Sequence, residues 1–135
     1  VCLAVGIAQR ALDEGIAYTK TRQQFGRPVA KNQALQFKMA DMAIQIEAAR
    51  QVVSHAHTLA DLGKPYGKEA AMAKCLAGDV AVQVALEGIQ LFGGYGYSRE
   101  YPVEKLLRDA KIFQIFEGTN EIQRVVIANH ILGKF

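Results

Sequence analysis

The chain has 135 residues, of which 50% are hydrophobic and 21% are charged, and its formal net charge is +3. This length and composition are those of one globular domain with a sizeable core, and the small positive excess, spread along the chain, does not favour binding to nucleic acid. The 3 histidines and 2 isolated cysteines form no ligand motif, so no metal site is predicted, and no stretch of about 18 uncharged apolar residues indicates a membrane span.

The first predicted helix covers residues 1–20. Val1, Val5, Ala8 and Leu12 follow a 4-3-4 spacing, which places them on one face of a helix. The stretch has no initiator Met, basic leader or helix cap, so it is not a signal peptide. We therefore expect residues 1–135 to be a fragment of a longer protein.

A turn at 21–29 separates this helix from a long one, because Gly26 and Pro28 break the helical pattern. The long helix is predicted over residues 31–62. Its apolar residues keep a strict alternation of four and three, typical of a helix packed at a shallow angle in a bundle. They are Leu35, Met39, Met42, Ile46, Ala49, Val53, Ala56 and Ala60.

Gly63 and Pro65 end the long helix, and a third helix is predicted over residues 68–92. Its side chains are small and apolar, which favours a central position with neighbours on several sides. Gly93 and Gly94 end it, since Gly readily takes the left-handed conformation after a helix. The Gly-rich stretch 93–97 lacks the preceding strand that a phosphate-binding loop needs, so it is interpreted as a surface turn. Cys2 and Cys75 are interpreted as reduced core thiols, which fits an intracellular compartment.

Pro102 begins a short helix over residues 103–112, with Leu106, Leu107 and Ala110 inward and Glu104 and Arg108 spaced for an exposed ion pair. The last helix follows the turn at Glu117, and either Thr119 or Asn120 can cap it. If Asn120 is the cap, Gln123 stands three residues on, as in a capping box. Its periodic residues are Ile122, Val125, Val126, Asn129 and Leu132.

Short loops between long helices, without the alternation typical of strands, predict an all-α, up-and-down bundle of the four-helix type with a short extra helix. Glu117 is its most suggestive residue, because it stands on a turn between an apolar stretch and a helix start. A carboxylate that substrate closes off from water there can serve as a general base, and Gly118 allows close approach of the backbone to a ligand. An acidic residue that only complements the helix dipole is the other interpretation.

The segment from Gln90 to Arg124 reads QLFGGYGYSREYPVEKLLRDAKIFQIFEGTNEIQR, and residues 22–26 form an R-x-x-F-G turn. Together, and in this order, these motifs resemble the C-terminal domain of acyl-CoA dehydrogenases. The resemblance covers essentially the whole chain. It implies that residues 1–135 are the C-terminal helical domain of that fold, close to the short-chain, medium-chain or butyryl-CoA branches. The N-terminal helical domain and the middle β domain would lie outside this chain.

The resemblance implies the FAD-dependent α,β-dehydrogenation of an acyl-CoA thioester to trans-2-enoyl-CoA, as in fatty acid β-oxidation. Glu117 would remove the α-proton, a hydride would pass to flavin N5, and Gly118 would contact the substrate. Further residues would contact FAD, some of them a flavin held mainly by a neighbouring subunit. They are Arg22, Phe25, Gln33, Gln90, Leu91, Phe92, Gly93, Gly94, Thr119, Asn120 and Glu121.

The family also implies an electron-transfer flavoprotein as acceptor, a homotetramer built as a dimer of dimers, and a location in the bacterial cytoplasm or the mitochondrial matrix. Phe116 stands where Tyr is frequent, and Glu121 where some members have Gln. A Glu at 117 argues against the isovaleryl and long-chain branches, whose base lies on an earlier helix.

Three alternatives remain open. The first is an acyl-CoA oxidase of the same fold, and the second is a family member that acts on something other than a straight-chain fatty acyl-CoA. The third is an oligomerising helical module without catalysis. We expect the isolated residues 1–135 to be inactive and to hold FAD weakly, because only part of the flavin site would lie in them.

Overall fold

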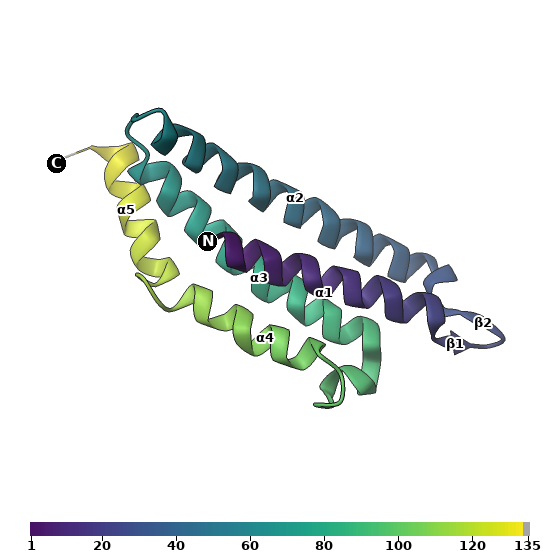
Figure 1. The fold of residues 1–135 in the computed structure, drawn as a ribbon. Coiled ribbons are helices and arrows are strands. Elements are labelled where there is room, and N and C mark those ends of the chain that lie inside the picture. Colours follow the sequence, from purple (N-terminus) through teal and green to yellow (C-terminus); the bar gives the residue numbers. More distant parts are fainter. Residues whose placement is uncertain (134–135) are drawn as a thin grey trace.

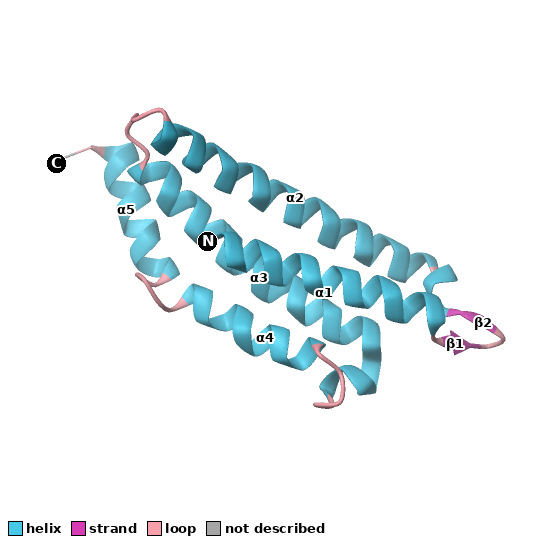
Figure 2. Ribbon diagram, in the orientation of Figure 1, coloured by secondary structure: helices cyan, strands magenta, loops and turns pink. Residues whose placement is uncertain are grey.

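The computed structural model describes residues 1–133 and has five α-helices. Figure 1 shows α1, α2 and α3 running side by side, with α4 alongside them and α5 at the end of the bundle where α3 begins. Figure 2 shows how little of the chain lies outside helices. The helices are α1 (Cys2–Thr21), α2 (Gln33–Asp61), α3 (Gly67–Phe92), α4 (Val103–Lys111) and α5 (Asn120–Leu132). This confirms the predicted all-α bundle, and these bounds lie within two residues of the predicted ones.

Helix α3 is the central element, because α1, α2, α4 and α5 all pack against it. Its alanines Ala73, Ala77, Ala81 and Ala85 are buried and let the neighbouring helices approach closely. By length and composition α3, with the turn that follows it, would qualify as a membrane-spanning helix. Burial by its four helical neighbours accounts for that apolar character.

The apolar face of α2 confirms the predicted 4-3-4 seam. Five residues in the middle of the seam are buried: Met42, Ile46, Ala49, Val53 and Ala56. Leu35 and Met39, near the start of the helix, are partly buried against the same core. The seam thus holds α2 against α3 along most of its length.

The turn after α1 contains a small β-hairpin that the sequence pattern did not predict. Strand β1 (Gln23–Gln24) pairs antiparallel with β2 (Arg27–Pro28). Phe25 and Gly26 at its tip have φ of 51° and 75°, as a two-residue hairpin with positive φ at both central positions requires. Two-residue strands are too short to show an alternating pattern, so the hairpin was not visible in the sequence.

Two further expectations differ from the structure. Cys75 is buried as expected, but Cys2 is exposed. In α5 the helix itself is confirmed, but Ile122, Val125 and Leu132 are exposed, and Asn120 is the buried residue of this helix. The periodicity therefore predicted a helix correctly but not which of its residues meet the core of this chain.

Helix α3 ends at Gly93, whose φ is 62°, and the chain continues as a 3-10 turn, η2 (Gly93–Tyr97), instead of an open surface turn. Gly96 in this turn is buried against the end of α3. A Cβ at position 96 would lie 2.5 Å from the carbonyl oxygen of Ile89 and 2.9 Å from Cβ of Phe92. Only a glycine allows this approach of two backbones.

We expect Gly96→Ala to lower the free energy of unfolding by about 1–3 kcal/mol, the usual cost of overpacking. Backbone atoms of Ile89 cannot rotate away from a new methyl group, so η2 must shift. Gly94→Ala is the matched control for stability, because no heavy atom lies within 4 Å of a Cβ built there. Thermal melts of the two variants test the prediction, and equal melting temperatures would contradict it.

Candidate functional site

Glu117 lies on the turn that joins α4 to α5. After α4, a short 3-10 helix, η3 (Ile112–Gln114), leads into residues 115–119. Glu117 has φ of 55° and Gly118 has φ of 88°, so two consecutive residues are left-handed. For a residue with a Cβ this conformation costs about 1–2 kcal/mol. Strain of this kind persists only where surrounding contacts hold the backbone, and it clusters at functional sites.

The start of α5 is capped by Thr119, whose Oγ1 accepts a hydrogen bond from the Ile122 N–H at 3.3 Å. The alternative with Asn120 as the cap is therefore wrong. Gln123 does reach back, but its Nε2 lies 3.3 Å from the carbonyl oxygen of Glu117 and 3.4 Å from that of Gly118. The amide of Gln123 thus supports the carbonyl groups of the strained turn.

Asn120 points its side chain into the bundle and is only 2% exposed. Its Nδ2 donates to Oδ1 of Asp79 at 2.8 Å and to the carbonyl of Cys75 at 3.1 Å. Its Oδ1 accepts from Nζ of Lys74 at 2.8 Å. The α3 helix thus takes both N–H groups of this buried amide and one hydrogen bond to its oxygen, so no N–H group of the side chain is left for a cofactor.

Burial and hydrogen bonds shift the pKa values of the titratable groups around Asn120. Burial raises the pKa of Asp79, but hydrogen bonds from Arg124, Gln114 and Asn120 together hold that pKa below its usual range. Burial lowers the pKa of Lys74 and raises the pKa of the Cys75 thiol. At any pH above the usual pKa range of an aspartate, the Asp79 carboxylate is therefore ionised where α3 meets the first turn of α5.

Glu121 follows Asn120 and is exposed. Hydrogen bonds from its own backbone N–H and from Thr119 hold the pKa of its carboxyl below the usual range. Glu117, Gly118 and Glu121 are exposed and Thr119 is half-buried. The candidate base, the predicted substrate contact and two predicted flavin contacts therefore form one accessible surface at this end of the bundle.

A second cluster of predicted site residues lines a cleft of about 610 Å³ at the other end of the bundle. Arg22 and the stretch Gln90–Gly94 contribute to its walls. The guanidinium carbon of Arg22 lies 5.5 Å from the centre of the Tyr95 ring, a cation–π contact. Within residues 1–133 no carboxylate pairs with Arg22, whose charge is open to an anionic ligand.

Not every predicted flavin residue lines this cleft. Phe25 is 99% exposed at the tip of the hairpin, and Gln33 is exposed on the first turn of α2. Leu91 and Phe92 line the cleft but are 4% and 5% exposed, and the Phe92 ring stacks on Tyr18 at 4.1 Å between centroids. Their side chains belong mainly to the core, and Gly93 and Gly94 leave open space beside them.

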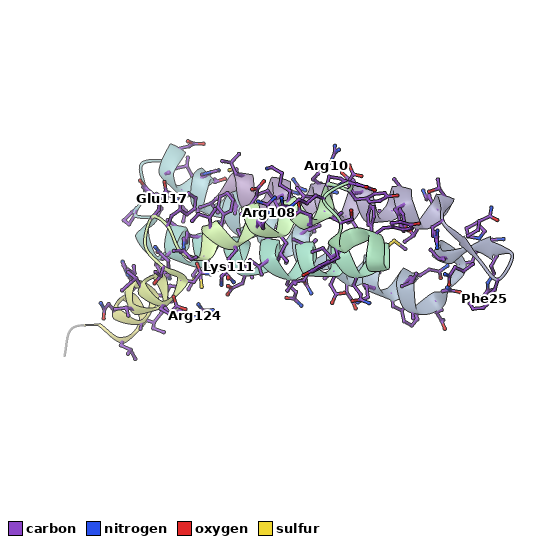
Figure 3. The ribbon with its side chains drawn as sticks, turned by 90° about the horizontal axis from the view of Figure 1, so that it is seen from below. Arg10, Phe25, Arg108, Lys111, Glu117 and Arg124 are labelled. Carbon is purple, nitrogen blue, oxygen red and sulfur yellow. The ribbon has the colours of Figure 1, made fainter. Side chains whose placement is uncertain are left out.

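The two clusters lie at opposite ends of the bundle, as Figure 3 shows for Glu117 and Phe25. Asp79, beside the Glu117 turn, and Leu91, in the cleft, are twelve residues apart on α3, which corresponds to about 18 Å along the helix. One copy of this chain therefore does not bring Arg22 and Glu117 into the same site.

Sequence reasoning missed several residues of both clusters. Tyr18, Gln24, Asn32 and Tyr95 line the cleft, but nothing in their local pattern marks them. The network under Asn120 did leave a signal: after the first turn of α3, residues 70–92 carry only three charges, Lys74, Asp79 and Glu87. Each of them meets a partner, and Glu87 pairs with Lys38 of α2.

Comparison with known proteins gives consistent matches over nearly the whole chain. The sequence model of the acyl-CoA dehydrogenase C-terminal domain matches residues 1–132. An acyl-CoA dehydrogenase of Bacillus subtilis (strain 168) is 57% identical over 130 residues, which cover 96% of this chain and 34% of that protein.

Solved structures agree with the sequence matches. Butyryl-CoA dehydrogenase from Megasphaera elsdenii has a TM-score of 0.94 and 53% identity, covering 96% of this chain and 34% of that chain. A chain from work on the electron transferring flavoprotein of Acidaminococcus fermentans has a TM-score of 0.95 and 54% identity, with coverages of 97% and 34%. The FAD complex of PigA has a TM-score of 0.91 and 34% identity, with coverages of 96% and 34%. This chain thus spans about a third of the length of these proteins.

Proposed function

This chain belongs to the acyl-CoA dehydrogenase family, and from that premise we propose that its protein dehydrogenates an acyl-CoA thioester at the α and β carbons with FAD as cofactor. The observation that carries the proposal is the exposed Glu117 carboxylate on a left-handed turn before α5. A carboxylate held there at the cost of backbone strain suits a base that must meet a carbon acid at a defined position.

Glu117 would take the α-proton, and the thioester oxygen must be held while negative charge develops on it. The Glu117 backbone N–H is a suitable donor, because no hydrogen bond within residues 1–133 uses it. Gly118 would let the thioester approach the backbone closely, and its φ of 88° is a conformation that residues with a side chain rarely adopt.

FAD, when bound, supplies the acceptor for the hydride that leaves the β-carbon. The residues present fit such a group. The cleft offers a guanidinium to a pyrophosphate and two glycines with open space beside them, and its volume lies within the usual range of about 300–1,000 Å³ for ligand sites. At the other end, the half-buried Thr119 and the exposed Glu121 adjoin the base.

The separation of the two clusters supports a flavin site shared between subunits. Thr119 and Glu121 would contact the flavin that serves Glu117. Arg22, Gln90 and Gly94 would contact a flavin held mainly by another subunit, and Phe25, exposed on the hairpin tip, and Gln33 would reach the same neighbour. This arrangement requires an oligomer, for which we propose the homotetramer. From membership of the family we also propose an N-terminal helical domain and a middle β domain outside residues 1–135.

The test uses the full-length protein with its flavin and no oxygen. Straight-chain acyl-CoA esters of increasing length should bleach the flavin and yield trans-2-enoyl-CoA, and the length that bleaches it fastest defines the substrate class. An electron-transfer flavoprotein should then restore the flavin colour faster than oxygen does. Rapid reoxidation by oxygen with release of hydrogen peroxide would indicate an oxidase. Absence of bleaching by any acyl-CoA would overturn the proposal.

A further inference from the structure

The Asp79 carboxylate bridges the two ends of the turn that carries Glu117. Its Oδ1 accepts hydrogen bonds from Nε2 of Gln114 at 2.7 Å and from Nδ2 of Asn120 at 2.8 Å. Gln114 is the last residue of η3, and Asn120 is the first residue of α5. One oxygen atom on α3 therefore ties together the residues just before and just after the five-residue turn 115–119.

The neighbouring residues of α3 complete this attachment. A Cβ at Gly78 would lie 3.0 Å from the carbonyl oxygen of Phe113 and 3.4 Å from Nδ2 of Asn120, so the backbone of α3 meets both flanks of the turn here. One turn earlier, Lys74 donates to Oδ1 of Asn120. Lys74, Gly78 and Asp79 thus form one surface of α3 that contacts the flanks of the turn.

Within the turn, the attachments involve the backbone: Gln123 lies within hydrogen-bond distance of the carbonyl groups of Glu117 and Gly118, and the Phe116 N–H donates to the carbonyl of Ile112. The Glu117 side chain is exposed and makes no hydrogen bond or ion pair within residues 1–133. No partner in this part of the chain fixes the side chain, so the backbone at φ of 55° sets the point and direction from which the carboxylate extends, and its two flanks and Gln123 hold that backbone. Releasing one flank would let the turn relax toward ordinary backbone conformations and move the carboxylate.

We propose that Asp79 is a positioning residue for this reaction: by holding Gln114 and Asn120 together, it fixes where the Glu117 carboxylate meets the acyl-CoA. The proposal rests on the function proposed above. Asp79 touches neither substrate nor flavin in this assignment. Its ion pair with Arg124, at 2.9 Å, is half exposed and therefore strongly screened, so the two contacts through Oδ1 are the ones that matter.

The experiment replaces Asp79 by Asn in the full-length flavoprotein. The amide keeps the size of the side chain and can still turn its single oxygen toward Gln114 and Asn120, with its N–H group then facing the Arg124 guanidinium. A neutral amide oxygen accepts weaker hydrogen bonds than a carboxylate does, so both contacts at the flanks of the turn are weakened. We expect the rate of flavin reduction per bound flavin, at saturating acyl-CoA, to fall about ten-fold, because small misplacements of a reacting group cost up to about 10²-fold. The acyl-CoA concentration for half-saturation and the flavin content should stay unchanged. A merely structural role would lower the melting temperature or the flavin content and leave the rate per bound flavin unaltered.

Glu87→Gln is the matched control. Glu87 lies on the same helix and is also paired, and its side chain is 37% exposed against 39% for Asp79, but it faces Lys38 on α2, away from the turn. If Asp79→Asn reduces its flavin as fast as Glu87→Gln, the positioning role is overturned. If Asp79→Asn does not fold, Gln114→Met decides, because it removes the hydrogen bond to Asp79 at one end of the turn, together with an exposed hydrogen bond from Lys111. A rate for Gln114→Met equal to that of Glu87→Gln overturns the proposal, and a slower rate per bound flavin supports it.

Glu117→Gln, measured in the same way, distinguishes failure of the proposed function from failure of the positioning role of Asp79. If it reduces flavin at the wild-type rate, the proposed function fails at its base. If it is inactive while Asp79→Asn and Gln114→Met match the control, the function stands and only the positioning role of Asp79 fails.

Discussion

Glu117→Gln is expected to slow flavin reduction by acyl-CoA at least about 10²-fold in the full-length protein, the lower part of the range for loss of a general base. Gln has nearly the same shape as Glu, but its amide does not accept the α-proton. Because the Glu117 side chain is exposed and makes no hydrogen bond within residues 1–133, its replacement should change neither packing nor stability. Bound flavin and the melting temperature should therefore match the wild type.

The measurement is anaerobic bleaching of the flavin after rapid mixing with acyl-CoA. Glu100→Gln is a suitable control, since Glu100 is an exposed carboxylate without an ion pair among the described residues and lies outside both candidate clusters. A Glu117→Gln protein that bleaches as fast as this control would show that the base lies elsewhere in the protein.

Arg22→Ala is expected to weaken FAD binding by roughly 10- to 100-fold, which corresponds to the 1.5–3 kcal/mol of a hydrogen bond to a charged group. Arg22 is exposed directly after α1 and contacts the Tyr95 ring without a carboxylate partner in residues 1–133. Little packing depends on Arg22, so its replacement should change the free energy of unfolding, and with it the melting temperature, only by the small amount typical of surface substitutions. If the flavin is shared between subunits, its loss should also weaken their assembly.

Flavin dissociation and thermal melting are compared between Arg22→Ala, Arg22→Lys and wild type. Lys should restore only part of the affinity, because an ammonium group does not make the bidentate contact of a guanidinium. Arg10→Ala controls for loss of an exposed charge on α1, where Arg10 pairs with Glu14 four residues on. An unchanged flavin affinity with a melting temperature several degrees lower would make Arg22 a structural residue and remove the basis for the shared flavin site.

Most of the fold could be predicted from the sequence because it depends on local patterns. The seam from Met42 to Ala56 and the small apolar residues of α3 predict long helices and a central one. The stop at Gly93 follows from the conformational freedom of a single residue type, and the position of Glu117 before α5 follows from the helix start at Thr119. These features need no knowledge of distant residues.

The local pattern did not determine the partner of each polar side chain. The sequence pattern allowed either Thr119 or Asn120 to be the helix cap. The structure buries Asn120 against Cys75 and Asp79, which lie more than 40 positions away in the sequence. The left-handed Phe25 was likewise hidden, because a hairpin of two-residue strands leaves no periodicity to detect. In α5, Val125 and Leu132 have the spacing of core residues but are exposed in this chain.

The sequence by itself therefore determined the helices, their order and the place of the candidate base on a turn, since each depends on residues a few positions apart. Only the tertiary structure decided that Asp79 holds both flanks of that turn and that Arg22 and Glu117 lie at opposite ends of the bundle. Both facts follow from how α3 packs against its neighbours, and contacts between distant segments leave no periodic mark on the segments that make them.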